Sequence, residues 1–217
     1  MKTLSKILTI GLIICLFSAC AIFRRKTVAE ALEATTQVAS RTSATFDYGV
    51  VINGVRWATR NVDMPGTFAQ NPEDAGMFFQ WNRKKGWNAT DERIKDWDNS
   101  RIEGTEWYAE NDPCPEGWRV PTREELQSLY DTGGEWTTQN GVYGYLWGVA
   151  PHQIFLPAAG WRFGSSSALG SAGTGGQYWG STLTGPITAI RLLFGNNINV
   201  EGNYRALGFS VRCVKIK

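Results

Sequence analysis

Apolar and polar residues alternate over several short stretches of the chain, and this two-residue period is typical of β-strands. In the stretch AIRLLF, residues 189–194, a strand would place Ile190 and Leu192 on one face and Arg191 and Leu193 on the other. The first face is suited to a core, whereas the second turns an arginine and a leucine outward. Strands are predicted at residues 50–52, 55–58, 153–156, 160–163, 178–182, 189–194 and 209–214.

Two helix starts interrupt this strand-rich pattern. The run NPED, residues 71–74, combines a capping residue, a proline at the first helical position and acids in the first turn, and it predicts a helix that buries Phe78 and Trp81. The run PTREE, residues 121–125, contains a capping box and predicts a second helix with Leu126 on its apolar stripe. Two helices among many short strands make the expected fold class α+β.

The N-terminus has the features of an export signal. Lys2 and Lys6 precede an apolar run that is too short to span a membrane. The run ends in FSAC, residues 17–20, which resembles the lipobox of bacterial lipoproteins, where cleavage before the cysteine precedes attachment of lipid to the thiol. We therefore expect Cys20 to carry a lipid anchor. The alternative is an ordinary signal peptide, which would leave Cys20 as a free thiol.

The 217 residues then divide into three parts, namely a signal peptide at 1–19, a tether at 20–45 and a single domain at 46–217. The full chain has 22 Lys and Arg against 20 Asp and Glu, so loss of Lys2 and Lys6 with the signal leaves 20 of each sign. A neutral mature chain gives no indication of a nucleic-acid partner, and none is expected.

Of the four cysteines, two remain within the domain after Cys15 leaves with the signal and Cys20 takes lipid. Cys114 and Cys213 then allow a single pairing, and disulfides persist in exported proteins. The alternative is a pair of catalytic or metal-binding thiols. A metal site would need further ligands, and His152 is the one histidine in the sequence.

Five phrases stand out along the domain, at residues 53–62, 114–122, 155–160, 178–182 and 208–215. Taken in this order, they resemble the Fibrobacter succinogenes major paralogous domain, which is common in Bacteroidetes lipoproteins. The resemblance covers the chain from about Asp47 to the C-terminus. It implies a C-type lectin-like fold of the variety shared with formylglycine-generating enzymes.

A narrower resemblance concerns residues 178–212, which look like the variable region of retroelement-diversified proteins, some of which resemble pilus tip adhesins. In such proteins a fixed C-type lectin-like scaffold carries surface positions that change. Tyrosine, arginine and asparagine side chains suit such a surface because they combine contact area with adaptable hydrogen bonding. The candidate ligand-binding residues are Tyr178, Trp179, Arg191, Leu193, Asn196, Asn197, Asn199, Asn203, Tyr204 and Leu207.

These candidates have plainer alternatives. Arg191 could lie on a solvated face, and Leu193 could be covered by the glycine-rich stretch at residues 164–176. Tyr178 and Trp179 could be core residues. Because neighbours on a strand face opposite ways, we expect at most one of that pair to be buried.

Other chemistries have less support. The glycine-rich stretch at 164–176 contains no lysine of the kind a phosphate-binding loop needs, so it predicts a flexible surface loop. The acids at residues 91–98 and 110–112 are typical of solvated loops, and the calcium-binding patterns of lectins are not intact. Ser/His/Asp catalysis would depend on His152 alone. No enzymatic activity, cofactor or metal is expected.

The sequence thus predicts an adhesin-type protein of the cell envelope, which binds a protein or a glycan on another cell or host surface. Its location would be the outer membrane, exposed at the surface or on a pilus with other pilus subunits, and the alternative is the periplasm. Two rival functions stay open. One is an enzyme similar to formylglycine-generating enzymes, which depend on a reactive cysteine pair. The other is a structural envelope lipoprotein without a specific ligand.

Overall fold

The computed structural model describes residues 28–40 and 43–217. The predicted signal peptide, Cys20 and the start of the tether lie outside these residues. The chain divides into two compact units, one that ends at Ser43 and one from Ala44 to Lys217. In the first unit, residues 28–40 form a helix with exposed side chains. No helix within the described ranges is long and apolar enough to cross a membrane.

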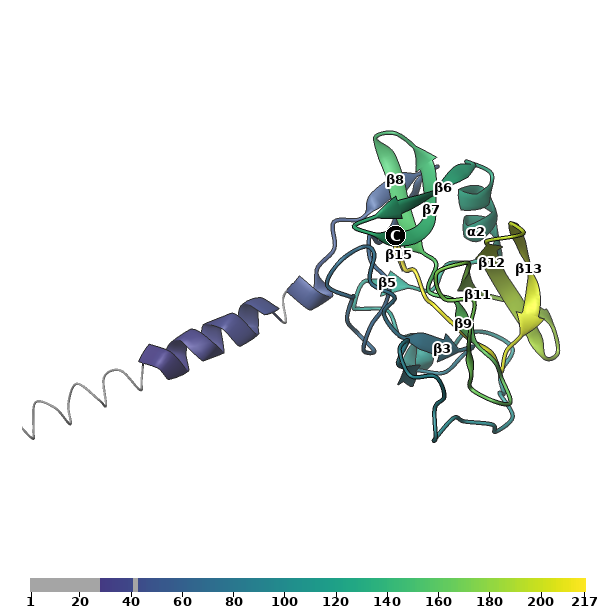
Figure 1. Cartoon of the computed structure of the whole chain (residues 1–217), viewed down its shortest axis with the longest axis horizontal. Helices are drawn as coiled ribbons and strands as arrows, with labels where there is room; N and C mark the ends of the chain where they lie inside the picture. Colours follow the sequence, from purple (N-terminus) through teal and green to yellow (C-terminus); the bar gives the residue numbers. More distant parts are fainter. Residues whose placement is uncertain (1–27, 41–42) are drawn as a thin grey trace, which may run out of the picture. The chain divides into compact units, whose positions relative to one another are not determined.

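The second unit is α+β, as the sequence predicts, and its many short strands form four antiparallel sheets (Figure 1). The sheet orders are β1-β2-β15-β5, β10-β9-β14-β3-β4, β11-β12-β13 and β6-β7-β8. The helices are the 3-10 helix η1 (Ala109–Asn111) and the α-helix α2 (Arg123–Tyr130). The strands are β1 (Val50–Ile52), β2 (Val55–Trp57), β3 (Phe78–Gln80), β4 (Gly86–Trp87), β5 (Trp118–Arg119), β6 (Gly134–Gln139), β7 (Val142–Val149), β8 (His152–Pro157), β9 (Trp161–Arg162), β10 (Leu169–Gly170), β11 (Gly176–Gly185), β12 (Thr188–Phe194), β13 (Asn199–Tyr204), β14 (Gly208–Phe209) and β15 (Val214–Lys215).

Asn-Gly pairs form two of the hairpin turns. Asn53 and Gly54 have φ of 49° and 78° and join β1 to β2, as predicted. Asn140 and Gly141 have φ of 49° and 83° and join β6 to β7. Both turns need the left-handed conformation at two successive residues, which asparagine followed by glycine tolerates best.

The capping box predicted at the start of α2 is present. The Thr122 hydroxyl accepts a hydrogen bond from the Glu125 backbone N–H at 3.3 Å, and the Glu125 carboxylate accepts one from the Thr122 N–H at 2.8 Å. The same carboxylate receives two hydrogen bonds from Arg119, at 2.7 and 2.8 Å. Burial raises the pKa of Glu125, but the hydrogen bonds from Arg119 and Thr122 outweigh it and leave that pKa lowered.

The helix predicted from residue 71 is wrong. The Asp74 carboxylate accepts a hydrogen bond from the Asn71 N–H at 2.8 Å and closes a turn. Gly76 then takes a left-handed φ of 64°, which ends any helical path, and Phe78 lies in strand β3. The local signals for a helix start are real, but the Asp74 carboxylate binds the backbone and side-chain N–H groups of Asn71 and so stabilises a turn instead of a helix.

The sheet β11-β12-β13 has apolar cores on both sides. Tyr178, Ile190 and Leu192 belong to one cluster, which also contains Leu126 of α2. Trp179, with neighbours from β3 and β14, belongs to a second cluster. Alternate side chains of β11 and β12 therefore enter different cores, so the first half of β11 and most of β12 are buried on both faces, whereas β13 is largely exposed.

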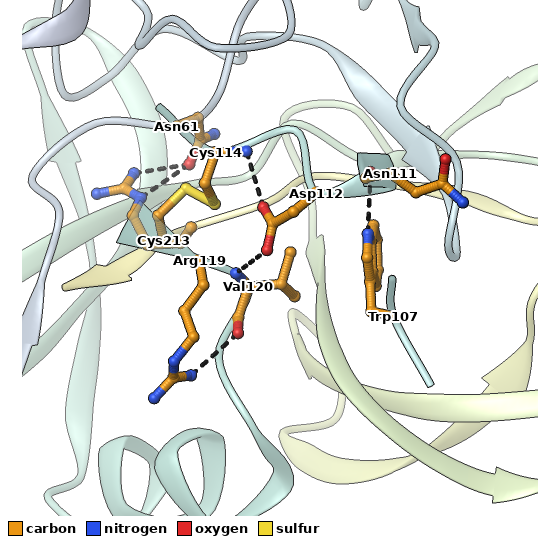
Figure 2. The surroundings of a disulfide bond; sticks show 9 residues. Asn61, Trp107, Asn111, Asp112, Cys114, Arg119, Val120 and Cys213 are labelled. Carbon is orange, nitrogen blue, oxygen red and sulfur yellow. Dashed lines mark hydrogen bonds between the residues drawn. A yellow bond between two sulfur atoms is a disulfide. The ribbon is translucent and has the colours of Figure 1, made fainter. Parts of the chain in front are cut away.

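A disulfide ties the C-terminal segment to the loop before β5. Cys114 and Cys213 form a disulfide bond, which is the single pairing that the sequence allows within the domain (Figure 2). The carboxylate of Asp112 lies beside the bond and accepts hydrogen bonds from the N–H groups of Cys114 and Val120, at 2.9 and 3.0 Å. Burial raises the pKa of Asp112 despite these bonds. The chain between the two cysteines includes every element from β5 to β14.

We predict that Glu125→Gln weakens the fold in a pH-dependent way. Glutamine still serves a capping box, so the change removes chiefly the Arg119 ion pair, at a cost of about 1 kcal/mol at pH 7. The lowered pKa of Glu125 means that its contribution is present above the unfolded-state value and is lost as the pH falls through the folded-state value. Urea unfolding of both chains should therefore differ at pH 7 and converge in acid. A difference in the free energy of unfolding that persists in acid would contradict a stabilising role for the charge of Glu125.

Candidate functional site

The face of β12 that carries Arg191 and Leu193 is continued by both neighbouring strands. Strand pairing sets Gln177 of β11 opposite Leu193, and Glu201 of β13 opposite Arg191. Residues directly opposite each other in antiparallel strands share a face. The two faces of AIRLLF are therefore divided as predicted, and the second face presents polar groups from three adjacent strands.

A cavity of about 490 Å³ opens over this face, and we refer to it as the Arg191 cavity. Its floor includes Gln177, Arg191 and Leu193, and its walls come from β9, from the glycine-rich loop and from the turn after β12. It gathers six of the ten residues predicted to bind a ligand, which are Arg191, Leu193, Asn196, Asn197, Asn203 and Leu207.

Arg191 is far more buried than a solvated strand arginine, with 7% of its surface exposed. Its Nη2 donates to the Glu201 carboxylate at 2.9 Å. Its Nε and Nη1 atoms are buried and have no hydrogen-bond partner among the described protein groups. Burial lowers the pKa of Arg191, and the charge of Glu201 acts in the opposite direction. The site thus contains a desolvated guanidinium that is only partly hydrogen-bonded.

Gln177 provides a complementary acceptor on the same floor. The side chain is 6% exposed, and its Oε1 has no donor among the residues that the structure describes. Gln177 is not among the ligand-binding residues predicted from the sequence. It lies directly before residues 178–212, the segment that carries the second resemblance. Unmatched donors and an unmatched acceptor together suit a ligand that carries both kinds of group.

A second hollow, of about 370 Å³, shares Thr174, Gly195 and Asn196 with the Arg191 cavity. Its aromatic side is Trp136 of β6 and Tyr143 of β7, which are 42% and 52% exposed. Their rings stack at an interplanar angle of 16° with centroids 6.0 Å apart. We refer to this second site as the aromatic hollow.

The glycine-rich loop borders the site without covering it. Ser171, Thr174 and Gly175 contribute to one wall of the Arg191 cavity. Leu193 is half-buried and lines the same cavity as these loop residues, so the loop lies beside it and leaves part of its side chain exposed. Asn196 and Asn197 are exposed in the turn after β12, and both line the cavity.

Four of the ten predicted residues lie outside the cavity. Tyr178 and Trp179 are 1% and 0% exposed, so the expectation that at most one of them is buried is wrong. The reason is that each side of β11 faces a core of its own. Asn199 is exposed on β13 and donates to Glu201, whereas Tyr204 is 59% exposed beside a separate hollow.

The aromatic residues that line the two hollows are not among the residues that the sequence predicts to bind a ligand. Trp136 and Tyr143 lie on a hairpin that the Asn140-Gly141 dipeptide signals as clearly as Asn53-Gly54 signals the first one. Trp161 and Phe163 line the Arg191 cavity. The sequence predicts a strand at these residues but gives no sign that they border a binding site. Only the tertiary structure brings Trp161 and Phe163 to the Arg191 cavity and Trp136 and Tyr143 to the adjoining hollow.

Comparison with protein-family models, with curated proteins and with solved structures finds no match to this chain.

We predict that Tyr178 is a structural residue and Tyr204 a surface residue. The Tyr178 hydroxyl donates to Pro157 O at 2.9 Å and accepts from Asn61 Nδ2 at 3.2 Å, and burial raises its pKa to about 12. Tyr178→Phe should lower the free energy of unfolding by about 1–3 kcal/mol, because it removes two buried hydrogen bonds and leaves one N–H of Asn61 without its acceptor. Tyr204→Phe should change it by less than about 0.5 kcal/mol. Equal effects in urea unfolding would contradict this division.

Proposed function

We propose that the chain is an exported, lipid-anchored binding protein of the cell envelope, with one C-type lectin-like domain used for adhesin-type recognition of a protein or a glycan. The observation that carries the proposal is the Arg191 cavity. It brings together residues from β11, β12, the turn after β12 and β13. A concave site with several convergent polar groups is the usual form of a binding site.

The composition of the site supports recognition. Aromatic rings, amides and one buried arginine resemble the chemistry of protein-binding and paratope surfaces. Its floor lies on paired strands, while its rim consists of a glycine-rich loop and the exposed turn at Asn196 and Asn197. Rigid strands can hold such a site in place while the rim residues vary.

This division into a rigid floor and an exposed rim also supports the resemblance to retroelement-diversified proteins. Leu192 and Phe194 are buried, whereas Asn196, Asn197 and Asn199 are exposed within a few residues of them. We propose that changes at the exposed positions alter the ligand and leave the core intact. A pilus tip or the outer membrane surface would present such a site to other cells.

The enzymatic alternative has less support. An enzyme similar to formylglycine-generating enzymes would need a reactive cysteine pair. Cys213 has no exposed surface and is bonded to Cys114, so neither sulfur is available as a nucleophile. A binding protein uses the same bond as a structural cross-link.

We predict that purified, folded chain contains no thiol that titrates at Cys114 or Cys213 without reductant. Mass spectrometry after alkylation in denaturant would locate any free thiol. A stoichiometric yield of alkylated Cys114 and Cys213 would contradict the cross-link and favour the enzyme.

We predict that the combined change Leu193→Ala, Asn196→Ala and Asn197→Ala lowers adhesion of protein-coated beads to target cells by at least roughly tenfold, because it removes contacts from the floor and rim of one site. Tyr48→Ala is the matched control, since Tyr48 is 81% exposed and does not line the site. Unchanged unfolding midpoints would show that both variants are folded. Equal adhesion of the triple variant and the parent chain would favour a structural lipoprotein without a specific ligand.

A further inference from the structure

Resting on the proposed binding function, we propose that the site recognises an acidic oligosaccharide, with a sugar carboxylate bound by Arg191 and an adjoining sugar ring placed against Trp136 and Tyr143.

The unmatched hydrogen bonds of Arg191 point to an anion. A guanidinium has five N–H donors, and Nε and Nη1 together carry three of them. These two atoms are buried and have no partner among the described protein groups, while Nη2 is held by Glu201. Buried donors on a charged group bond most strongly to an ionised acceptor, and a carboxylate presents two oxygens to a guanidinium.

The charge of the cavity favours the same ligand. Arg191 is the one ionisable side chain among the described residues that line it, and Glu201 contacts the guanidinium from β13 without being part of the lining. Within the described chain, the lining itself adds no carboxylate. Glu201 offsets part of the charge of Arg191, but its exposed carboxylate bonds Nη2 alone, so the N–H donors of Nε and Nη1 stay unpaired by any described group.

The remaining walls fit hydroxyl groups. The Gln177 Oε1 atom is a buried acceptor without a donor, and a sugar hydroxyl can supply one. Asn196, Asn197 and Asn203 add side-chain amides, each able to donate and to accept. A sugar carries hydroxyls that do both, so this set suits an acidic sugar better than a carboxylate alone.

The aromatic hollow favours a sugar over an acidic peptide. Trp136 and Tyr143 present stacked, partly exposed rings, and the hollow shares its wall of Thr174, Gly195 and Asn196 with the Arg191 cavity. The electron-rich face of an aromatic ring attracts the C–H face of a pyranose. Two adjoining hollows of about 490 and 370 Å³ suit successive rings of one oligosaccharide.

Matched probes test the carboxylate directly. We would titrate the purified full chain, by calorimetry, with trigalacturonate, a hyaluronan tetrasaccharide and sialyllactose, and with the methyl ester of each. Each pair keeps the same rings and hydroxyls and differs in the charge. At least one acid should bind, and its ester should bind roughly 10- to 100-fold more weakly, as expected for loss of a hydrogen bond to a charged group.

Variants then identify the groups involved. Arg191→Met retains much of the apolar volume and should bind the acid as weakly as the ester, without discriminating between them. Arg123→Ala removes an exposed arginine from α2 and is the matched control, which should bind like the parent chain. Trp136→Ala should weaken the acid and its ester by the same factor, because it removes stacking and not charge recognition. Unfolding midpoints check that each variant is folded.

Three results would overturn the inference and leave the binding function standing. One is equal affinity for acid and ester, and another is discrimination that survives Arg191→Met. The third is failure of every saccharide in the panel while cell adhesion still depends on the site; binding of a polyglutamate peptide in that case would replace the sugar with an acidic peptide. Adhesion that does not depend on the site would overturn the proposed function as well.

Discussion

The buried guanidinium of Arg212 is the constraint on which the rest of the domain depends. Arg212 is 1% exposed, and its Nε and Nη2 donate to Asn61 Oδ1 at 3.0 and 2.7 Å while Nη1 donates to Ala58 O at 3.2 Å. The Nδ2 atom of Asn61 in turn donates a hydrogen bond to the Tyr178 hydroxyl, which donates one to the carbonyl oxygen of Pro157. Burial lowers the pKa of Arg212 only to about 10, so it is charged at neutral pH. A buried charge of this kind is stable only while its partners stay in place, which ties four distant segments together.

The same network explains why the site has a rigid floor. It holds β11 through Tyr178, and the neighbouring side chains Gln177 and Trp179 are therefore fixed on the opposite face. Trp179 packs on Phe209 with ring centroids 4.2 Å apart, and the guanidinium of Arg191 lies over the same Phe209 ring, 5.8 Å from its centroid. The second core therefore extends directly to the edge of the Arg191 cavity.

Arg191 and Arg212 show how burial alone does not define the role of an arginine. Both are more than nine-tenths buried, and burial lowers the pKa of each. Every nitrogen of Arg212 has a protein acceptor, whereas Nε and Nη1 of Arg191 have none within the described chain. The first arrangement is a structural cross-link, and the second retains hydrogen-bonding capacity for a ligand.

The sequence by itself determined features that depend on only a few neighbouring residues. These are the Asn53-Gly54 turn, the capping box of Thr122 and Glu125, and the two faces of AIRLLF. These features depend on φ preferences, nearby hydrogen bonds and strand alternation, all of which the sequence contains. Tertiary structure decided the rest, because it depends on which faces meet. It made the segment after Asn71 a turn followed by β3, and it buried Tyr178 and Trp179 in two different cores. It also set Gln177 beside Arg191 and placed Trp136 and Tyr143 in the adjoining hollow.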